Sequence, residues 1–146
     1  MKNGLVWEKS LDQAHLDLRF DVLRQGLPRG TEHYPGIDED PRTTFLCAYE
    51  NGELIGCSTL QVDRREGCKF RIRGMAVRSE HRNKGVGTKI VKGLQDFARS
   101  QGSGIWCNAR IKAVPMYERC GFVIISDLFE IEGIGLHHDM QWILSD

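Results

Sequence analysis

The chain has 146 residues, and a domain of that size buries roughly 68–70% of its unfolded surface. We therefore expect residues 1–146 to form a single domain whose core needs neither disulfides nor a metal. Lys and Arg together number 20, as do Asp and Glu, so the formal net charge is zero. This balance argues against a nucleic-acid-binding protein, which usually carries a basic excess.

Cysteine usage and hydropathy bear on the location of the protein. The five cysteines form no C-x-x-C pair, and most lie in apolar, strand-like runs, which is typical of reduced, buried thiols rather than a metal site. The N-terminal segment MKNGLVWEKS is too short and too polar for a signal peptide. No apolar run approaches the roughly 20 residues of a membrane span. We expect a cytoplasmic protein with no membrane partner.

The first predicted elements are a short strand and a helix. LVWEKS reads as the strand, and Ser10 and Gln13 match an S-x-x-Q capping box. Apolar residues then recur at helical spacing up to about Leu23. Residues 26–42 contain glycines, three prolines and several acids, and this composition predicts a loop.

The clearest predicted hairpin covers residues 43–62. Two β-rich runs flank Asn51-Gly52, a pair that suits a type I′ turn because both central residues need positive φ. The alternating run at residues 68–77 continues the sheet. Its basic side chains are two residues apart and therefore share one face of the strand: Lys69, Arg71 and Arg73.

The second half of the chain alternates helices and strands. Helical periodicity runs from Gly85 to about Ser100, and residues 104–110 then predict a strand. Residues 113–122 predict a short helix with a proline in its first turn. The runs FVII and HHDMQWIL supply two final strands. The predicted fold is therefore a mixed α/β domain.

A basic, glycine-bearing turn, RNKGVG, stands directly before the helix that begins near Gly85. A helix N-terminus presents unpaired N–H groups and about half a positive charge, which makes it an anion site. Glycines let the backbone approach a bulky group closely. The alternative is an ordinary strand-to-helix turn with surface cations, and this motif alone does not decide between the two.

The combination of RGMAV, the R-x-x-G-x-G turn and AVPMYERCGF resembles the GNAT superfamily of N-acetyltransferases over essentially the whole chain. The segments WCNAR, YERCGF and EGIGLHHDM are also similar to glyphosate N-acetyltransferase and its small bacterial relatives. The resemblance implies a mixed, mostly antiparallel sheet of six or seven strands, flanked by helices, whose splayed central strands hold coenzyme A. It also implies acetyl-CoA as co-substrate, direct transfer of an acetyl group to an amine, and no metal.

The same resemblance implies where acetyl-CoA binds. Backbone groups of the strand before the turn would pair with the pantetheine arm, at Met75, Ala76 and Val77. The turn and the start of the helix would hold the diphosphate, at Arg82, Asn83, Lys84, Gly85, Val86, Gly87 and Thr88.

Two residues are implied as catalytic groups, His137 as general base and Tyr117 as general acid. Many GNAT enzymes use a glutamate on the strand before the turn, and CKFRIRGMAV has no acid. An imidazole suits proton removal near neutrality, and a phenol suits protonation of a thiolate. The alternative is that both residues serve only packing. The neighbouring His138 should face the opposite side of the strand, and His15, His33 and His81 are expected at the surface.

Three arginines are implied to bind the acceptor: Arg24, Arg73 and Arg110. A guanidinium matches a carboxylate or phosphonate in bidentate fashion, so three of them favour a small anionic amine of the amino acid or aminophosphonate type. Ordinary structural explanations exist as well: Arg71 and Arg73 could be cross-strand partners of acids on a solvated face, and Arg24 could be a cation at a helix C-terminus.

Two other functions remain open from the residues. A protein or peptide N-acetyltransferase of the same fold would need an open groove lined by acids. A non-catalytic acyl-CoA-binding sensor would keep the turn and could lose the base and the acid. The chain could be a monomer or a homodimer.

Overall fold

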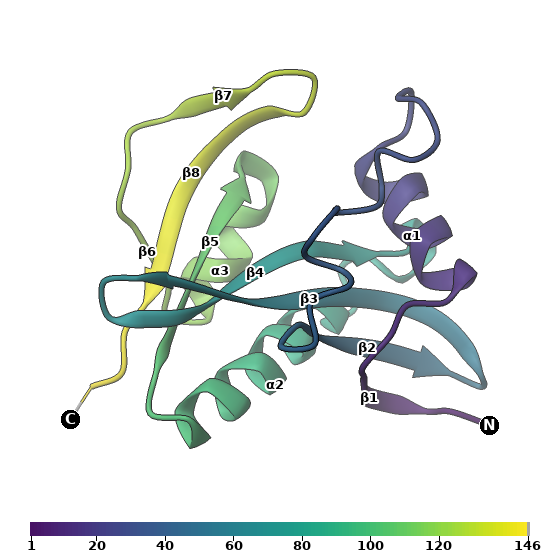
Figure 1. Cartoon of the computed structure of the whole chain (residues 1–146), viewed down its shortest axis with the longest axis horizontal. Helices are drawn as coiled ribbons and strands as arrows, with labels where there is room; N and C mark the ends of the chain where they lie inside the picture. Colours follow the sequence, from purple (N-terminus) through teal and green to yellow (C-terminus); the bar gives the residue numbers. More distant parts are fainter. Residues whose placement is uncertain (146) are drawn as a thin grey trace.

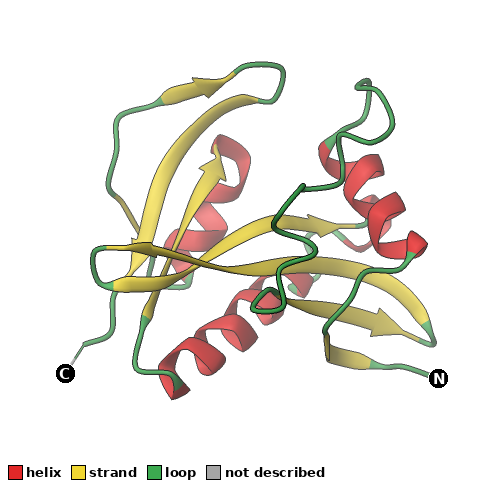
Figure 2. Cartoon of the chain, in the orientation of Figure 1, coloured by secondary structure: helices red, strands yellow, loops and turns green. Residues whose placement is uncertain are grey.

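Eight strands form one sheet and three α-helices pack on it in the computed structural model, which describes residues 1–145 (Figures 1 and 2). The strands are β1 (Gly4–Glu8), β2 (Thr44–Glu50), β3 (Glu53–Arg65), β4 (Cys68–Val77), β5 (Gly104–Arg110), β6 (Val123–Ile124), β7 (Phe129–Ile131) and β8 (Gly135–Trp142). The helices are α1 (Gln13–Leu23), α2 (Val86–Ser100) and α3 (Val114–Arg119), with short 3-10 turns at Ser79–His81 and Ile111–Ala113.

The sheet order is β1-β2-β3-β4-β5-β8-β6, and β7 pairs with β8 outside this path. All of these pairs are antiparallel except β4–β5, which is parallel. The predicted mixed α/β class is thus confirmed. The expected six or seven strands become eight because the three-residue β7 pairs with β8. A run that short carries too little alternation to be recognised in the sequence.

Helix α1 begins later than the sequence predicted. The capping box of Ser10 and Gln13 is wrong, because Asp12 is the N-cap and its carboxylate accepts a hydrogen bond of 3.0 Å from the His15 backbone N–H. A carboxylate is at least as good an N-cap as a serine hydroxyl. The helix therefore starts at Gln13, with Asp12 satisfying one of its free N–H groups.

The two faces of the sheet are covered by different helices. The predicted apolar stripe of α2 is confirmed, because Ile90, Val91 and Leu94 are fully buried in the larger core cluster, which also contains side chains of α3. A smaller cluster forms where α1 packs on β2, β3 and β4. In this region the expected surface position of His15 is wrong. Its ring is buried and packs edge-on against Phe45, with ring centroids 5.4 Å apart.

The two central strands separate halfway along their length. Strands β4 and β5 pair only from Cys68↔Gly104 to Ile72↔Cys107, and beyond that point β4 has no partner on its β5 side among residues 1–145. A β-bulge lies just after this point, where Gly74 and Met75 oppose a single residue of β3. Gly74 has φ +56°, and a Cβ there would lie 3.1 Å from Arg19 and Tyr34. The predicted splayed strands are therefore confirmed, and Gly74 is required where they part.

The cysteines agree with the expectation of reduced thiols. All five are free, four of them are buried and Cys120 is half-buried. Among the described residues, no helix is both long enough and apolar enough to cross a membrane.

Candidate active site

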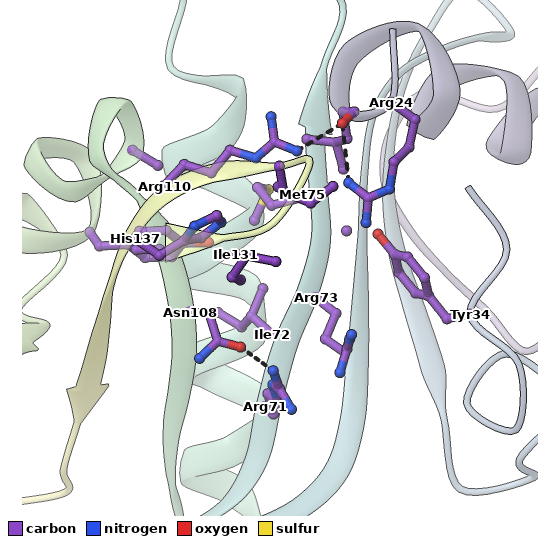
Figure 3. A pocket seen from close by; sticks show the side chains of 16 residues that line it. Arg24, Tyr34, Arg71, Ile72, Arg73, Met75, Asn108, Arg110, Ile131 and His137 are labelled. Atoms are coloured by element: carbon purple, nitrogen blue, oxygen red, sulfur yellow. Dashed lines mark hydrogen bonds between the residues drawn. The ribbon is translucent and has the colours of Figure 1, made fainter. Parts of the chain in front are cut away.

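A cavity of about 210 Å³ opens where β4 and β5 part (Figure 3). Its walls come from the C-terminal end of α1, the loop that follows it, the two splayed strands and the β7–β8 hairpin. In Figure 1 this hairpin and α1 stand on opposite sides of the gap. Six of the residues predicted from the sequence line the cavity: Arg24, Arg73, Met75, Arg110, Tyr117 and His137.

A buried arginine fixes the loop that forms one wall. The Arg19 side chain is fully buried and donates two hydrogen bonds to Asp38, of 2.8 and 2.9 Å, and others to Thr59 and to the Glu32 carbonyl. Its guanidinium also lies 4.1 Å from the centroid of the Tyr34 ring. A bidentate ion pair with this additional bonding holds its partners in one geometry. Tyr34, in the predicted loop, is thereby held against the cavity.

The three predicted arginines meet in this cavity. Arg24 and Arg110 both donate to the Leu23 carbonyl, over 3.1 and 2.8 Å, and Arg73 lies 5.2 Å from the Tyr34 ring centroid. None of the three has a carboxylate within 4.0 Å among residues 1–145. Burial lowers the pKa of Arg73, aided by Arg71, and that of Arg110, aided by Arg24.

The charges that line the cavity are all positive. Four arginines contribute to the wall, and no Asp or Glu is among the described residues that line it. Arg71 pairs with Asp63 at 3.2 Å, as expected for a cross-strand partner of an acid. Arg73 has no such partner among residues 1–145, so this structural explanation does not apply to it. Unpaired cations that converge on one cavity favour an anionic ligand.

His137 lies on β8 with its side chain only 3% exposed. Its Nδ1 donates a hydrogen bond of 2.8 Å to the Gly135 carbonyl, and its ring stacks on Phe129. A carbonyl can only accept, so the neutral ring carries its proton on Nδ1 and keeps a lone pair on Nε2. Burial, with a smaller contribution from Arg110, lowers the His137 pKa below 6.5 and keeps the ring neutral.

Tyr117 lies on α3 and is 4% exposed, in contact with the ring of Phe122. Burial raises its pKa well above the usual value, with a smaller contribution from the neighbouring Cys107. The phenol is therefore protonated over the whole physiological range. His138, the neighbour of the candidate base, donates from Nδ1 to the Ser126 carbonyl and does not line the cavity.

The predicted anion-binding turn has the backbone that an anion site requires. Gly85 is the N-cap of α2 with φ +80°, and no side chain of residues 1–145 caps this helix end. Asn83 also has positive φ, and the residues from Arg82 to Gly85 are exposed. The first N–H groups of α2 therefore point outward without an intrahelical partner.

The turn lies beside the strand and the helix that reach into the cavity. A Cβ built at Gly87 would lie 3.8 Å from the side chains of both Val77 and Met116. Val77 ends β4 and Met116 precedes Tyr117 in α3. Ala76 and Val77 pair with β3, Met75 lies in the bulge before them, and none of the three pairs with β5, so this side of β4 faces the gap. The open start of α2 and the side of β4 that does not pair with β5 are thus contiguous.

Among the lining residues that sequence reasoning missed, three have polar side chains: Tyr34, Arg71 and Asn108. Tyr34 comes from a loop whose position depends on the buried Arg19–Asp38 pair, which no local pattern reveals. Arg71 carried a signal, because it shares a strand face with Arg73. Asn108 is likewise on the same face of β5 as Arg110.

Comparisons with known proteins agree with this geometry. A sequence model of the Acetyltransferase (GNAT) family matches residues 9–122. YitI of Bacillus subtilis strain 168, an uncharacterized N-acetyltransferase, is 33% identical over 97 residues, which are 63% of this chain and 65% of YitI. The chain covers about half the length of two other curated relatives.

Solved structures show the same fold. An acyl-CoA N-acyltransferase from Pseudomonas aeruginosa superimposes with a TM-score of 0.79 at 23% identity, covering 97% of this chain and 99% of the other. A Bacillus subtilis acetyltransferase in complex with CoA has a TM-score of 0.71 at 19% identity, covering 99% of this chain and all of the other.

Proposed function

The chain belongs to the GNAT acetyltransferase family, and on this premise we propose that it transfers an acetyl group from acetyl-CoA to the amine of a small anionic molecule. The acceptor is of the amino acid or aminophosphonate type, as the similarity to the glyphosate N-acetyltransferase group also suggests. One observation carries the proposal. Among residues 1–145, three arginines without carboxylate partners converge, beside a buried neutral histidine, on a cavity that no acid lines.

The residues that hold acetyl-CoA in this proposal are those at the turn and on β4. The uncapped N-terminus of α2 and the backbone from Arg82 to Thr88 bind the diphosphate. The free side of Met75–Val77 binds the pantetheine arm by main-chain hydrogen bonds. A Bacillus subtilis acetyltransferase of the same fold was solved in complex with CoA, which supports CoA as the type of ligand. Acetyl-CoA supplies an activated thioester when bound.

His137 acts as general base in the proposal. An ammonium cannot attack a thioester, because its lone pair carries a proton. Nε2 of His137 is free to take that proton, since Nδ1 is committed to the Gly135 carbonyl. The lowered pKa keeps this lone pair available at neutral pH.

Tyr117 acts as general acid and protonates the departing thiolate. Its raised pKa means that the phenol holds a proton at neutral pH. Burial raises the pKa of a thiol above its value of about 8.5 in water, so a thiolate that forms beside the phenol in this buried site is a stronger base than in solution and takes up the proton. The backbone N–H groups near Met75–Val77 polarise the thioester carbonyl.

The arginines bind and orient the acceptor. Arg24, Arg73 and Arg110 hold an acidic group of the acceptor and leave its amine near His137. Their positive charge disfavours a lysine side chain of a peptide, and a cavity of about 210 Å³ suits a small molecule. A peptide acetyltransferase is therefore the weaker candidate. A sensor without activity would not need a neutral histidine and a protonated phenol in the same cavity.

An acceptor screen tests the proposal. Purified protein is incubated with acetyl-CoA and single amines, and free CoA is measured by thiol release. Aspartate and glutamate should exceed asparagine and glutamine in kcat/KM by about 10- to 100-fold, because a charged hydrogen bond contributes about 1.5–3 kcal/mol. Release that is fastest with a lysine peptide, or absent with every amine although acetyl-CoA binds, would reject the proposal.

A further inference from the structure

A second polar group lies at the end of the cavity away from Arg24 and Arg110. In Figure 3, Arg71 and Asn108 occupy the lower end, whereas Arg24 and Arg110 are at the upper end and Arg73 lies between them. Arg71 and Arg73 are on the same face of β4, two residues apart, which separates their Cα atoms by roughly 6.6 Å.

Three contacts hold the Arg71 guanidinium in place. Nη1 donates to Asp63 over 3.2 Å, Nη2 donates to the side-chain oxygen of Asn108, and the group lies 4.4 Å from the centroid of the Trp106 ring. Asn108 is itself oriented, because its NH₂ group donates to Asp139, which also pairs with Arg65 at 2.8 Å. The guanidinium is therefore pre-organised at the end of the cavity.

Arg71 still has an unused donor. Its Nε atom is buried and has no hydrogen-bond partner among residues 1–145, while the side chain lines the cavity. A buried N–H without an acceptor costs about 1–3 kcal/mol, so such groups are normally satisfied by protein, water or ligand. The one carboxylate that pairs with Arg71, that of Asp63, is 37% exposed and is outside the cavity wall. This ion pair leaves Arg71 able to attract a second anion.

The geometry points to Arg71 as a specificity-determining residue that binds the far acidic group of the acceptor and so selects its length. This inference rests on the proposed acetyl transfer to an anionic amine. One acidic group of the acceptor lies between Arg24, Arg73 and Arg110, and the other reaches Arg71. An extended three-carbon spacer separates two carboxyl carbons by roughly 5 Å, against roughly 4 Å for two carbons. The spacing of Arg71 from Arg73 therefore favours a glutamate-like acceptor over an aspartate-like one.

Binding of simple dicarboxylates tests this without any acetyl transfer. Isothermal titration is carried out with succinate (two carbons between the carboxylates) and with glutarate (three) on the wild type and on Arg71→Gln. The wild type should bind glutarate more tightly. Arg71→Gln should weaken glutarate binding by about tenfold and leave the affinity for succinate nearly unchanged, because one charged hydrogen-bond donor is lost at the far end of the cavity.

Lys69→Gln is the matched control, because Lys69 lies on the same face of β4, two residues farther along, and does not line the cavity. This variant should keep the wild-type preference. Arg71→Lys, which preserves the charge, should fall between the wild type and Arg71→Gln, and a thermal melt of each variant checks folding. The inference is overturned if Arg71→Gln weakens both dicarboxylates equally, if it weakens neither, or if the wild type binds neither.

Thiol release with aspartate and glutamate separates this inference from the proposed function. If the dicarboxylates bind as expected and no amine is acetylated, the proposed function fails and Arg71 remains a length-selective anion ligand. If amines are acetylated and Arg71→Gln leaves the ratio of kcat/KM for glutamate over aspartate unchanged, the inference fails and acetyl transfer stands.

Discussion

At the scale of single residues, two adjacent histidines have different surroundings because of the faces they occupy. Strand alternation directs His137 into the cavity, whereas His138 bonds the Ser126 carbonyl elsewhere. The hydrogen bond from His137 Nδ1 to Gly135 and the burial of the ring leave a neutral imidazole with a free Nε2. These are the properties of a base that works near pH 7.

Removal of this base should affect turnover far more than cofactor binding. We expect His137→Ala to lower kcat at least about 100-fold, as is typical when a general base is lost, with acetyl-CoA affinity unchanged. His138→Ala is the control and should retain most activity. Steady-state kinetics and titration with acetyl-CoA measure both effects, and near-normal turnover of His137→Ala would exclude the role.

The pH dependence of the wild type follows from the same residue. A base must be unprotonated to act, so kcat/KM should fall as pH drops through the His137 pKa. Because burial lowers that pKa below 6.5, the midpoint of the acid limb should also lie below 6.5. A midpoint above 6.5 for the enzyme group in a rate profile, or an NMR titration of His137 with a raised pKa, would contradict this.

The proposed role of Tyr117 as general acid can be tested by removing its hydroxyl group. Tyr117→Phe keeps the ring packed against Phe122 and removes only the proton donor. We expect kcat to fall about 100-fold with little loss of thermal stability. An unchanged rate in the thiol-release assay would indicate that solvent protonates the thiolate.

At the scale of elements, the start of α2 combines a left-handed backbone conformation at Gly85 with an uncapped helix end. Gly85 adopts φ +80° with nothing near a built Cβ, so its requirement for glycine is conformational. Gly102, after the same helix, has φ +68° and equally open surroundings. An alanine would therefore be similarly strained at Gly85 and at Gly102, but only Gly85 lies at the start of α2.

Substitution of Gly102 serves as the control for substitution of Gly85. Gly85→Ala and Gly102→Ala should each lower the free energy of unfolding by about 1 kcal/mol, the cost of a left-handed conformation for an L-residue. Only Gly85→Ala should also weaken acetyl-CoA binding, by about tenfold, because a shift of the turn misaligns the N–H groups at the start of α2. Chemical denaturation and titration calorimetry separate the effects. Equal affinity losses in both variants would remove the turn from the cofactor site.

Elements with strong periodicity were predictable, and those set by tertiary contacts were not. The hairpin at Asn51-Gly52 and the apolar stripe of α2 are confirmed because local patterns determine them. The capping box at Ser10 was wrong because Asp12 competes for the same N–H groups. The separation of β4 from β5 was expected only from family resemblance. Tyr34 lines the cavity because Arg19, which is distant in the sequence, contacts its ring, and no local pattern predicts this contact.

At the scale of the whole molecule, the α1 side of the sheet contains a buried histidine with no assigned chemical task. Burial, with a contribution from Arg19, lowers the pKa of His15 to about 4. In the folded protein the ring stays neutral down to that pH, whereas in the unfolded chain it takes up a proton below about 6.5. The stability due to neutral His15 is therefore complete above pH 6.5 and is lost as pH falls toward 4.

The corresponding prediction concerns unfolding. Between pH 7 and pH 4, the free energy of unfolding should drop by about 3 kcal/mol more in the wild type than in His15→Leu, at about 1.36 kcal/mol per pH unit. Denaturant unfolding of both proteins across this range measures the difference. Parallel curves would show that His15 does not contribute to acid sensitivity.

The central claim is that one chain holds acetyl-CoA at the start of α2 and an acidic amine among three arginines, so that both meet between Tyr117 and His137. A crystal structure with CoA and glutamate tests it most directly. The account predicts the diphosphate on the N–H groups of residues 83–88, a carboxylate of glutamate among Arg24, Arg73 and Arg110, and the amine within hydrogen-bond distance of His137 Nε2. A diphosphate bound elsewhere, or an amine directed away from His137, would contradict it.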